Sequence, residues 1–258
     1  MTTLARLSVA TASLSAILAV GATAPAAAGE AVTYQAAGAD YEGYYAPAEG
    51  EAKGLVLVIH DWDGLTDYEK KRADMLAGLG YDAFALDLFG KGNRPETTDA
   101  KKAETGKLYK DREAMLTRVE AGLEEARKES GKEAAAVIGY CFGGAGVLEL
   151  ARSGKAKDVA GYATFHGTLA TPDGQSYPEG TAPILIAQGG GDTSVPPSEA
   201  YSLVKTLEDE KIPYELEVYS GAPHAFTVFD SKSYRKVADE ESWNALQGFL
   251  GRYLGKQS

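Results

Sequence analysis

Residues 135–144 read AAVIGYCFGG, an apolar run that ends in a cysteine between glycines. Gly139 and Gly143 stand two positions to either side of Cys141, which is the spacing of the G-x-S-x-G nucleophile elbow with sulfur in place of oxygen. The turn in such an elbow strains the backbone of the nucleophile, and close neighbours fit only without a Cβ. The pattern therefore predicts a strand, a sharp turn and a helix, with Cys141 exposed where the strand ends.

The motif alone leaves two interpretations of this cysteine open. In the first, the sulfur lies over the N-terminus of the helix, where the helix dipole lowers the pKa of a thiol and the backbone N–H of Phe142 faces a developing oxyanion. In the second, the junction is only a tight turn, and Cys141 is a buried and inert side chain, as free cysteines often are.

Strand and helix patterns alternate on both sides of this junction. Residues 55–60 (LVLVIH) are apolar without alternation, as in a strand that is covered on both faces of a parallel sheet. Thr66 and Glu69 have the capping-box spacing that begins a helix. Further strands are expected at residues 83–88, 134–140, 159–165, 184–188 and 214–219, and further helices at 112–130, 143–152, 198–210 and 234–254. The alternation predicts an α/β fold with a doubly wound, mostly parallel sheet.

Two kinds of segment lie outside this alternation. Residues 31–34 and 41–46 are short strand patterns that we expect to pair as an N-terminal antiparallel hairpin at one edge of the sheet. Residues 89–98 and 167–181 are the longest connections, and long loops commonly form the walls of a pocket.

Residues 1–28 have the three-part layout of a secretory signal peptide. Arg6 precedes a moderately apolar stretch, and the small residues that end at Ala28 offer an A-x-A cleavage site. An uncleaved membrane anchor is disfavoured because serine and threonine dilute the apolar run. We expect cleavage after Ala28, a single domain over residues 29–258, and an exported protein, periplasmic or secreted, without stable membrane association.

The composition excludes several classes of protein. The 258 residues are 44% hydrophobic and 24% charged, as in a globular domain with a buried core. A formal net charge of -11 would repel phosphate backbones, so no nucleic acid partner is expected. Cys141 is the single cysteine, so neither an intrachain disulfide nor a cysteine-rich zinc site can form. The glycine-rich nucleotide-binding motifs are missing from the sequence, and we expect no cofactor.

A group of potential metal ligands crowds the end of one predicted strand, at His60, Asp61 and Asp63. Adjacent residues at a strand end point in different directions, and no distant cluster in the sequence completes a coordination shell. We therefore expect no metal site.

The chain has three histidines, so the base for Cys141 comes from a small set. In α/β hydrolases the nucleophile, the acid and the histidine follow one another along the chain, each after a later strand. Asp192 follows the predicted strand at 184–188, and His224 follows the one at 214–219, as that order requires. In this interpretation His224 takes the proton of Cys141 during attack, or already holds it in a thiolate–imidazolium ion pair. Asp192 accepts the other ring N–H, and water hydrolyses an acyl-thioenzyme.

A second oxyanion donor is expected beside Phe142. The loop after residues 55–60 is its expected source, and the backbone N–H of Trp62 is the candidate. His166 follows the predicted strand at 159–165, so we expect it near the elbow as a packing residue or a wall of the substrate pocket.

Five segments together resemble the dienelactone hydrolase family, whose cysteine-nucleophile members have the α/β-hydrolase fold. They are VIHDWDGL (58–65), GYCFGG (139–144), TFHGTLATP (164–172), GGGDTSVPP (189–197) and YSGAPHAF (219–226). The resemblance covers roughly residues 54–254. It implies a hydrolase of small-molecule esters or lactones, with a catalytic triad of Cys141, Asp192 and His224 and oxyanion N–H groups from Phe142 and Trp62.

The sequence departs from the family at three positions. Where the founding members keep a glutamate that contacts the resting thiol, this chain has Asp61. Where they bind the substrate carboxylate with two arginines, it has Lys91 and Val228, one point charge and one apolar side chain. Lys91 or Arg94 is a hypothetical anion anchor in the substrate pocket, with solvated loop cations as the alternative. The expected substrate is therefore a small ester or lactone, without commitment to a dienelactone.

Two other functions are compatible with a cysteine elbow. Glutamine-amidotransferase-like enzymes place a glutamate two residues after the histidine, and Phe226 stands there instead. A non-catalytic binding or thiol redox-sensing protein on the same fold is the remaining alternative, since Cys141 can be oxidised.

Overall fold

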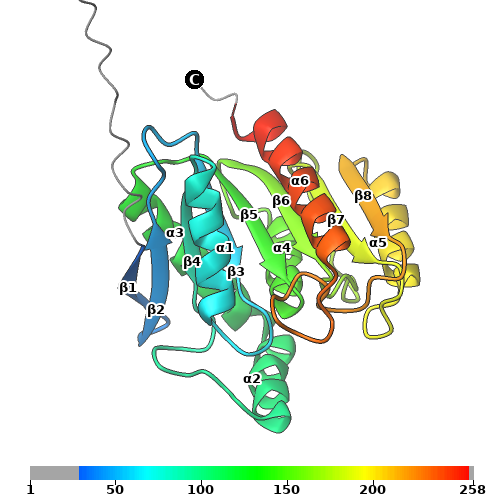
Figure 1. Ribbon diagram of the computed structural model, residues 1–258, viewed down its shortest axis with the longest axis horizontal. Coiled ribbons are helices and arrows are strands. Elements are labelled where there is room, and N and C mark those ends of the chain that lie inside the picture. The colour runs from blue at the N-terminus through cyan, green and yellow to red at the C-terminus, as the bar shows by residue number, and fades with distance from the viewer. Residues whose placement is uncertain (1–28, 256–258) are drawn as a thin grey trace, which may run out of the picture.

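The computed structural model describes residues 29–255, so the predicted signal peptide at residues 1–28 lies outside the described residues. One sheet holds eight strands in the spatial order β1-β2-β4-β3-β5-β6-β7-β8 (Figure 1). The strands are β1 (Glu30–Ala36), β2 (Ala39–Ala46), β3 (Leu55–Ile59), β4 (Asp82–Leu86), β5 (Ala135–Tyr140), β6 (Val159–Phe165), β7 (Ile184–Gly189) and β8 (Tyr214–Tyr219). The helices are α1 (Asp67–Gly78), α2 (Thr98–Lys110), α3 (Arg112–Ser130), α4 (Phe142–Ser153), α5 (Pro197–Asp209) and α6 (Lys236–Tyr253).

Strand pairing confirms the predicted topology. β1 pairs antiparallel with β2, and β2 pairs antiparallel with β4, so the N-terminal hairpin occupies one edge of the sheet. From β3 to β8 every neighbouring pair is parallel. The result is the expected doubly wound α/β sheet, whose parallel strands all finish at the same edge.

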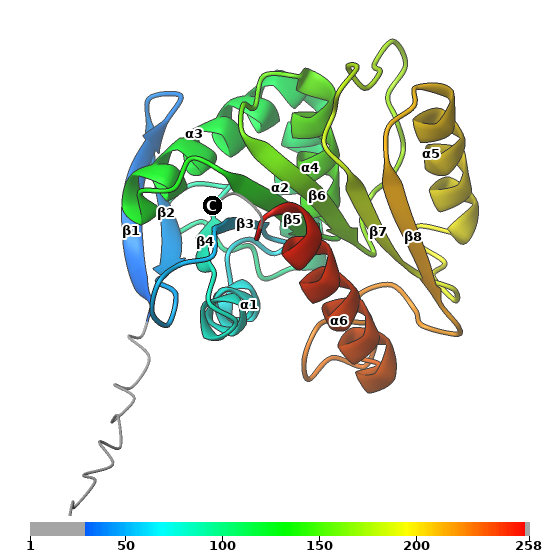
Figure 2. The same ribbon diagram turned by 90° about the horizontal axis from the view of Figure 1, so that it is seen from above.

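Helices cover both faces of the sheet (Figure 2). α1 and α6 lie on one face, and α3, α4 and α5 lie on the other. Each face has its own apolar core, with Leu76 and Phe249 in one and Leu57 and Phe142 in the other. The central strands β3 and β5 are buried at every position, which explains their unbroken apolar sequences.

The capping box predicted for α1 is present. Thr66 is the N-cap, its hydroxyl accepts the N–H of Tyr68 at 3.3 Å, and the carboxylate of Glu69 accepts the N–H of Thr66 at 2.9 Å. Glu69 is fully buried, which is rare for a glutamate unless its carboxylate has hydrogen-bond partners, as it has here. Its carboxylate therefore lies inside the molecule, against the loop that connects β3 to α1.

Helix α2 is absent from the sequence prediction, which leaves residues 99–111 unassigned. Only Thr105 and Leu108 of this helix are buried, so it lacks the apolar stripe that reveals a packed helix. Thr97 caps its N-terminus through a bond from the N–H of Ala100. α2 lies beyond the edge of the sheet at which the parallel strands finish (Figure 1).

The other predicted elements agree with the structure within two residues. α3 begins at Arg112 and ends at Ser130, as predicted, between the N-cap Asp111 and Gly131, whose φ is +67°. No helix within residues 29–255 is long and apolar enough to cross a bilayer.

Candidate active site

Cys141 stands in the turn between β5 and α4 with the strained backbone that the motif predicts. Its φ is +50° and its ψ is -111°, a combination that residues other than glycine rarely adopt. A Cβ on Gly139 would lie 2.4 Å from the carbonyl oxygen of Gly143, and a Cβ on Gly143 would lie 2.3 Å from that of Ile59. Both glycines are therefore required for the elbow to pack against its own helix and against β3.

Strand β6 holds the elbow from the other side. The N–H of Cys141 donates to the carbonyl of Phe165 at 3.0 Å, and the carbonyl of Cys141 accepts the N–H of Thr168 at 3.1 Å. Cys141 is half-buried, so the residue is not sealed in the apolar core as the inert-cysteine interpretation requires.

Three side chains from three different loops meet at this elbow. The Nε2 atom of His224 lies 3.1 Å from the sulfur of Cys141, and its Nδ1 atom lies 2.8 Å from Oδ2 of Asp192. The other carboxylate oxygen of Asp192 accepts the N–H groups of Ser194 at 2.8 Å and Val195 at 2.9 Å. The Asp192 side chain is fully buried, whereas His224 is partly exposed, so the carboxylate is held fixed beneath a histidine that faces the thiol.

Glycines bring the aspartate and histidine loops together. β7 and β8 are parallel neighbours, so the loops that follow them lie side by side. The N–H of Gly190 donates to the carbonyl of Tyr219 at 2.8 Å, and that of Gly191 donates to Ala222 at 2.9 Å. A Cβ on Gly189 would lie 2.5 Å from the carbonyl oxygen of Ala222. The run of three glycines thus allows the backbone contact that places Asp192 under His224.

The predicted direction of the thiol pKa is wrong. Burial of the sulfur, and then the negative charge of Asp61, raise the pKa of the Cys141 thiol above its ordinary value. The N–H of Phe142 acts in the opposite direction but does not outweigh them. A raised pKa favours a neutral thiol in the resting protein, with His224 placed to receive its proton.

The loop after β3 fixes the peptide that contains the N–H of Trp62. Nδ1 of His60 donates to the carbonyl of Asp61 at 2.6 Å, and its Nε2 accepts the N–H of Leu88 at 3.0 Å, so the ring is neutral with its proton on Nδ1. The Asp61 carbonyl and the Trp62 N–H belong to one trans peptide and point in opposite directions. His60 thereby fixes the direction of the Trp62 N–H, which has no acceptor of its own in the described chain.

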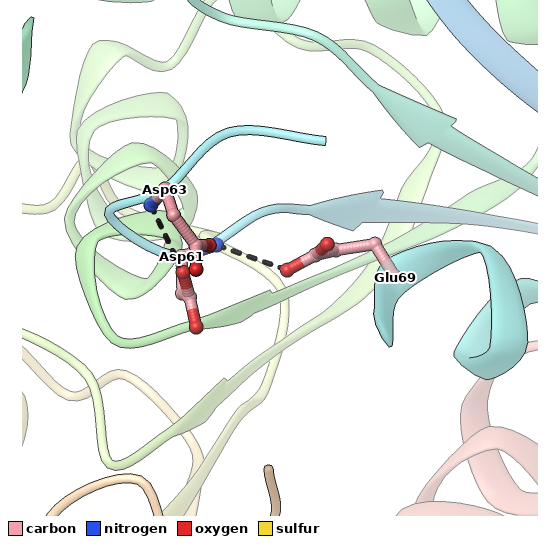
Figure 3. Close-up of side chains that lie close together, drawn as sticks. All are labelled: Asp61, Asp63 and Glu69. Atoms are coloured by element: carbon pink, nitrogen blue, oxygen red, sulfur yellow. Dashed lines mark hydrogen bonds between the residues drawn. The ribbon is translucent and has the colours of Figure 1, made fainter. Parts of the chain in front are cut away.

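Three carboxylates gather beside this peptide, from Asp61, Asp63 and Glu69, with oxygens within 4.8 Å of one another (Figure 3). The N–H of Asp61 donates to Glu69 at 3.3 Å, and the N–H of Asp63 donates to Asp61 at 3.1 Å. Burial and the neighbouring carboxyl groups raise the pKa of Asp61 well above its ordinary value, and burial raises that of Glu69 to about 7. For Asp63, hydrogen bonds with Asp61 and Lys101 outweigh burial and lower the pKa. These hydrogen bonds account for the cluster, and the expectation of no metal site stays a prediction.

Helix α2 contributes two residues that the sequence does not single out. Nζ of Lys101 lies 3.1 Å from the carboxylate of Asp63 and 5.3 Å from the centre of the Trp62 ring. The hydroxyl of Tyr109 bonds to that of Thr168 at 2.9 Å. The ring of Tyr109 lies 5.3 Å from that of Phe142, the residue after Cys141, at an interplanar angle of 87°, and burial raises the pKa of this phenol. The only available signal was the N-cap threonine of α2, because the helix has no apolar stripe.

Lys91 and Arg94, the two cations predicted for the substrate pocket, have partners on other elements. Lys91 pairs with Glu42 of β2 at 3.4 Å, and Arg94 pairs with Asp87 at 3.3 Å. Val228 is half-buried in the loop that follows His224. Both cations are thus paired with carboxylates. A role of Lys91, Arg94 and Val228 in substrate binding stays a prediction. Contact between Asp61 and the resting thiol also stays a prediction.

His166 lies behind His224 rather than on an open wall. It is fully buried, its φ is +40°, and its ring centroid is 5.3 Å from that of His224 at an interplanar angle of 70°. Its Nε2 atom lies 2.8 Å from the hydroxyl of Thr227. His166 therefore packs inside the protein, as one of the two expectations for it states, and one of the residues it contacts is the histidine of the candidate triad.

Comparisons with known proteins give the family to which the chain belongs. The sequence model of the dienelactone hydrolase family matches residues 41–254. A probable 2-oxo-3-(5-oxofuran-2-ylidene)propanoate lactonase of Bradyrhizobium sp is 27% identical, over 79% of this chain and 86% of its own. A putative carboxymethylenebutenolidase of Escherichia coli is 27% identical over 79% of each chain. The crystal structure of a dienelactone hydrolase-like promiscuous phosphotriesterase from metagenomic libraries has a TM-score of 0.78 at 27% identity, covering 87% of this chain and 98% of that one. Family match and fold together place this chain in the dienelactone hydrolase family, with the α/β-hydrolase fold.

Proposed function

We propose that the protein hydrolyses small esters or lactones through an acyl-thioenzyme formed on Cys141. The observation that carries the proposal is the pair of contacts made by His224, to the sulfur of Cys141 at 3.1 Å and to the carboxylate of Asp192 at 2.8 Å. A nucleophile, a base in contact with it and an acid that orients the base form the arrangement that acyl transfer requires.

In the acylation half-reaction, Nε2 of His224 accepts the thiol proton while the sulfur of Cys141 bonds to the carbonyl carbon and the carbonyl oxygen becomes an oxyanion. The carbon–oxygen bond to the alcohol then breaks, and His224 returns the proton to the departing oxygen. In a lactone that alcohol stays attached to the acyl group. In the second half-reaction water attacks the thioester carbon while His224 takes a proton from the water. The carbon–sulfur bond then breaks, and His224 returns that proton to the sulfur, which gives a carboxylic acid and a free thiol.

The raised pKa of the thiol favours proton transfer during attack over a standing thiolate–imidazolium pair. Asp192 supports this by accepting the Nδ1 proton of His224, which leaves Nε2 free to act as the base. The same raised pKa argues against the redox-sensing alternative, since sensor cysteines combine a low pKa with exposure.

The proposed oxyanion donors are the backbone N–H groups of Phe142 and Trp62. Phe142 is the first residue of α4, where the N–H has no partner inside the helix, and the Trp62 peptide is held by His60. Loss of one such donor typically raises the barrier by about 2.7–4 kcal/mol.

The proposed substrate is an ester or lactone with no carboxylate next to the scissile bond. The relatives are named for a propanoate lactone and for a carboxymethylenebutenolide, both of which contain a carboxyl group. In this chain Lys91 and Arg94 are paired with Glu42 and Asp87, so neither is free to bind such a group.

Hydrolysis of p-nitrophenyl acetate tests the mechanism. We expect Cys141→Ala to abolish turnover, His224→Ala to do nearly so, and Asp192→Asn to reduce turnover less. Because Cys141 is the only cysteine, inactivation by iodoacetamide and protection by substrate report on this one thiol. Full esterase activity in Cys141→Ala would rule the mechanism out.

A further inference from the structure

A chain of hydrogen bonds runs behind His224, outside the proposed triad. Nε of Arg72 donates to the hydroxyl of Tyr68 at 3.3 Å, and both residues belong to α1. The hydroxyl of Tyr68 lies 2.6 Å from that of Thr227, in the loop that follows His224. The hydroxyl of Thr227 lies 2.8 Å from Nε2 of His166, whose ring packs against His224.

Arg72 is a fixed starting point for this chain. Its guanidinium is almost fully buried, forms an ion pair with Asp239 of α6 and donates to the carbonyl of Thr227 at 2.8 Å. It also lies 4.3 Å from the ring centre of Phe229 and 5.2 Å from that of Trp243. An arginine keeps its charge in proteins and can only donate, so the first bond of the chain has one possible direction.

That direction propagates through the two hydroxyl groups, each of which has one proton. Tyr68 accepts from Arg72, and we assign its own proton to the hydroxyl of Thr227, its partner at 2.6 Å. Thr227 in turn donates its proton to Nε2 of His166. This nitrogen is then unprotonated, and the proton of a neutral His166 must be on Nδ1.

The surroundings of His166 oppose a positive charge on its ring. The residue is fully buried, and its Nδ1 atom has no hydrogen-bond partner in the described part of the chain. Burial first, and then the charges of His224 and Arg72, lower its pKa well below the ordinary value. His224 and Arg72 are the groups whose charge acts on it, and the rings of Phe226 and of Tyr140, a titratable group whose own pKa is raised by burial, pack against the rest.

We infer that His166 is a positioning residue for His224, a neutral Nδ1–H imidazole that holds the His224 ring in place and tolerates a positive charge on it. When His224 takes the proton of Cys141 it becomes an imidazolium, with the His166 ring centroid 5.3 Å away. A second cation at that distance would oppose the proton transfer, whereas a neutral ring does not. The inference rests on the proposed function, because it concerns the base of the proposed triad.

Nitrogen-15 NMR of the imidazole rings tests the tautomer directly, in the full-length protein and without any substrate. The chain has three histidines, and His60 is an internal reference because its contacts fix the Nδ1–H form. We expect His166 to show the same Nδ1–H form and to stay neutral over the pH range of activity. An Nε2–H or doubly protonated His166 would overturn the inference.

Two variants test the role of the chain in proton transfer. Tyr68→Phe and Thr227→Val each remove one hydroxyl, and Tyr162→Phe is the matched control, because Tyr162 is buried on β6 and its hydroxyl has no partner in the described residues. We expect both test variants to lose the Nδ1–H preference and to lower kcat by about tenfold at unchanged KM, the scale of one buried hydrogen bond.

Alkylation of Cys141 by iodoacetamide gives a readout that does not depend on turnover. In the two test variants a hydroxyl proton is no longer directed to Nε2 of His166, so this nitrogen is protonated more easily and then opposes the charge on His224. We expect alkylation to slow most at acidic pH, while Tyr162→Phe follows the wild type. If both variants match the control in kcat and in the pH profile of alkylation, the inference is wrong. Normal esterase activity in Cys141→Ala would instead defeat the proposed function and leave the NMR and alkylation tests valid.

Discussion

Gly143 lies where a side chain would collide with the backbone of another strand. A Cβ at this position would be 2.3 Å from the carbonyl oxygen of Ile59 and 2.7 Å from that of His60. Gly146 belongs to the same helix, and a Cβ there would meet side-chain carbons of Ile59 at 3.4 Å, an ordinary contact. A comparison of alanine substitutions at these two glycines therefore distinguishes the steric requirement of the elbow from the general effect of adding a methyl group to α4.

We predict that Gly143→Ala is less stable than the wild type and nearly inactive, while Gly146→Ala keeps both properties. Relief of the Gly143 collision requires a shift of β3 or of the elbow, which typically costs about 1–3 kcal/mol. The methyl group of Gly146→Ala favours the helix by up to about 1 kcal/mol. Urea denaturation and p-nitrophenyl acetate hydrolysis measure the two effects. A fully active and stable Gly143→Ala would contradict the packing of the elbow.

Among single residues, the sequence predicts those whose place follows from a motif or from the order of the strands. It misses those whose role depends on contacts with residues far away in the chain. Cys141, Asp192 and His224 each follow a strand in a fixed order, so chain order alone places them in one site. The roles of Lys101 and Tyr109 depend on where α2 folds back over the sheet. The error in the direction of the thiol pKa has the same origin, since the helix dipole is visible in the sequence and the burial of the sulfur is not.

Glu69 connects helix α1 to the loop that precedes it. Its carboxylate accepts the N–H of Thr66 at 2.9 Å and the hydroxyl of Thr66 at 2.8 Å, and it accepts the N–H of Asp61 at 3.3 Å. One carboxylate thereby holds both ends of residues 61–66, the loop that contains the Trp62 N–H. Because the group is fully buried, ionisation is costly, and its pKa rises to about 7.

We predict that Glu69 makes the stability of the protein depend on pH. Its pKa of about 7 in the folded state exceeds the ordinary 4.5, so the folded protein binds this proton more tightly than the unfolded chain. The resulting stabilisation is complete below pH 4.5 and is lost as the pH rises through 7. The free energy of unfolding should therefore fall over this window, and fall less in Glu69→Gln.

Urea denaturation at about pH 5 and pH 8, on either side of the Glu69 transition, measures this difference. Glu113→Gln is the matched control, because Glu113 is an exposed glutamate in the first turn of α3. Asp61 also has a raised pKa and acts in the same direction, but it is unchanged in all three proteins. The same pH dependence in wild type and Glu69→Gln would show that this carboxyl does not titrate as described.

Elements were predictable from the sequence when burial left a periodic pattern. α3 buries Met115, Val119 and Leu123 at helical spacing and has clear residues at both ends, so its predicted bounds are correct. α2 buries only Thr105 and Leu108 and covers the end of the sheet rather than one of its faces. A helix with only two buried side chains gives no periodic signal, which is why the sequence predicts the site without Lys101 and Tyr109.

The whole molecule is strongly acidic, and part of that charge is concentrated around the thiol. The formal net charge is -11, and after burial of the sulfur the carboxylates of Asp192 and Asp63 act to raise the pKa of Cys141. Lys101 lies nearby but pairs with Asp63. The total charge can be counted from the sequence, whereas its concentration at the site depends on three loops that meet only in the folded chain.

We therefore predict that a neutral ester is a better substrate than an equally long ester with a carboxylate on its acyl side. p-Nitrophenyl butyrate and mono-p-nitrophenyl succinate form such a pair, and their rates with hydroxide correct for intrinsic reactivity. The kcat/KM of the neutral ester should be higher at low salt, because like charge slows the approach of an anion to the site. The difference should shrink as the Debye length falls from about 30 Å at 0.01 M salt to about 3 Å at 1 M. A preference for the succinate ester at low salt would contradict this prediction and would require a cation in the pocket. The variants Lys91→Met and Arg94→Met would then identify which side chain leaves its carboxylate partner to bind the substrate.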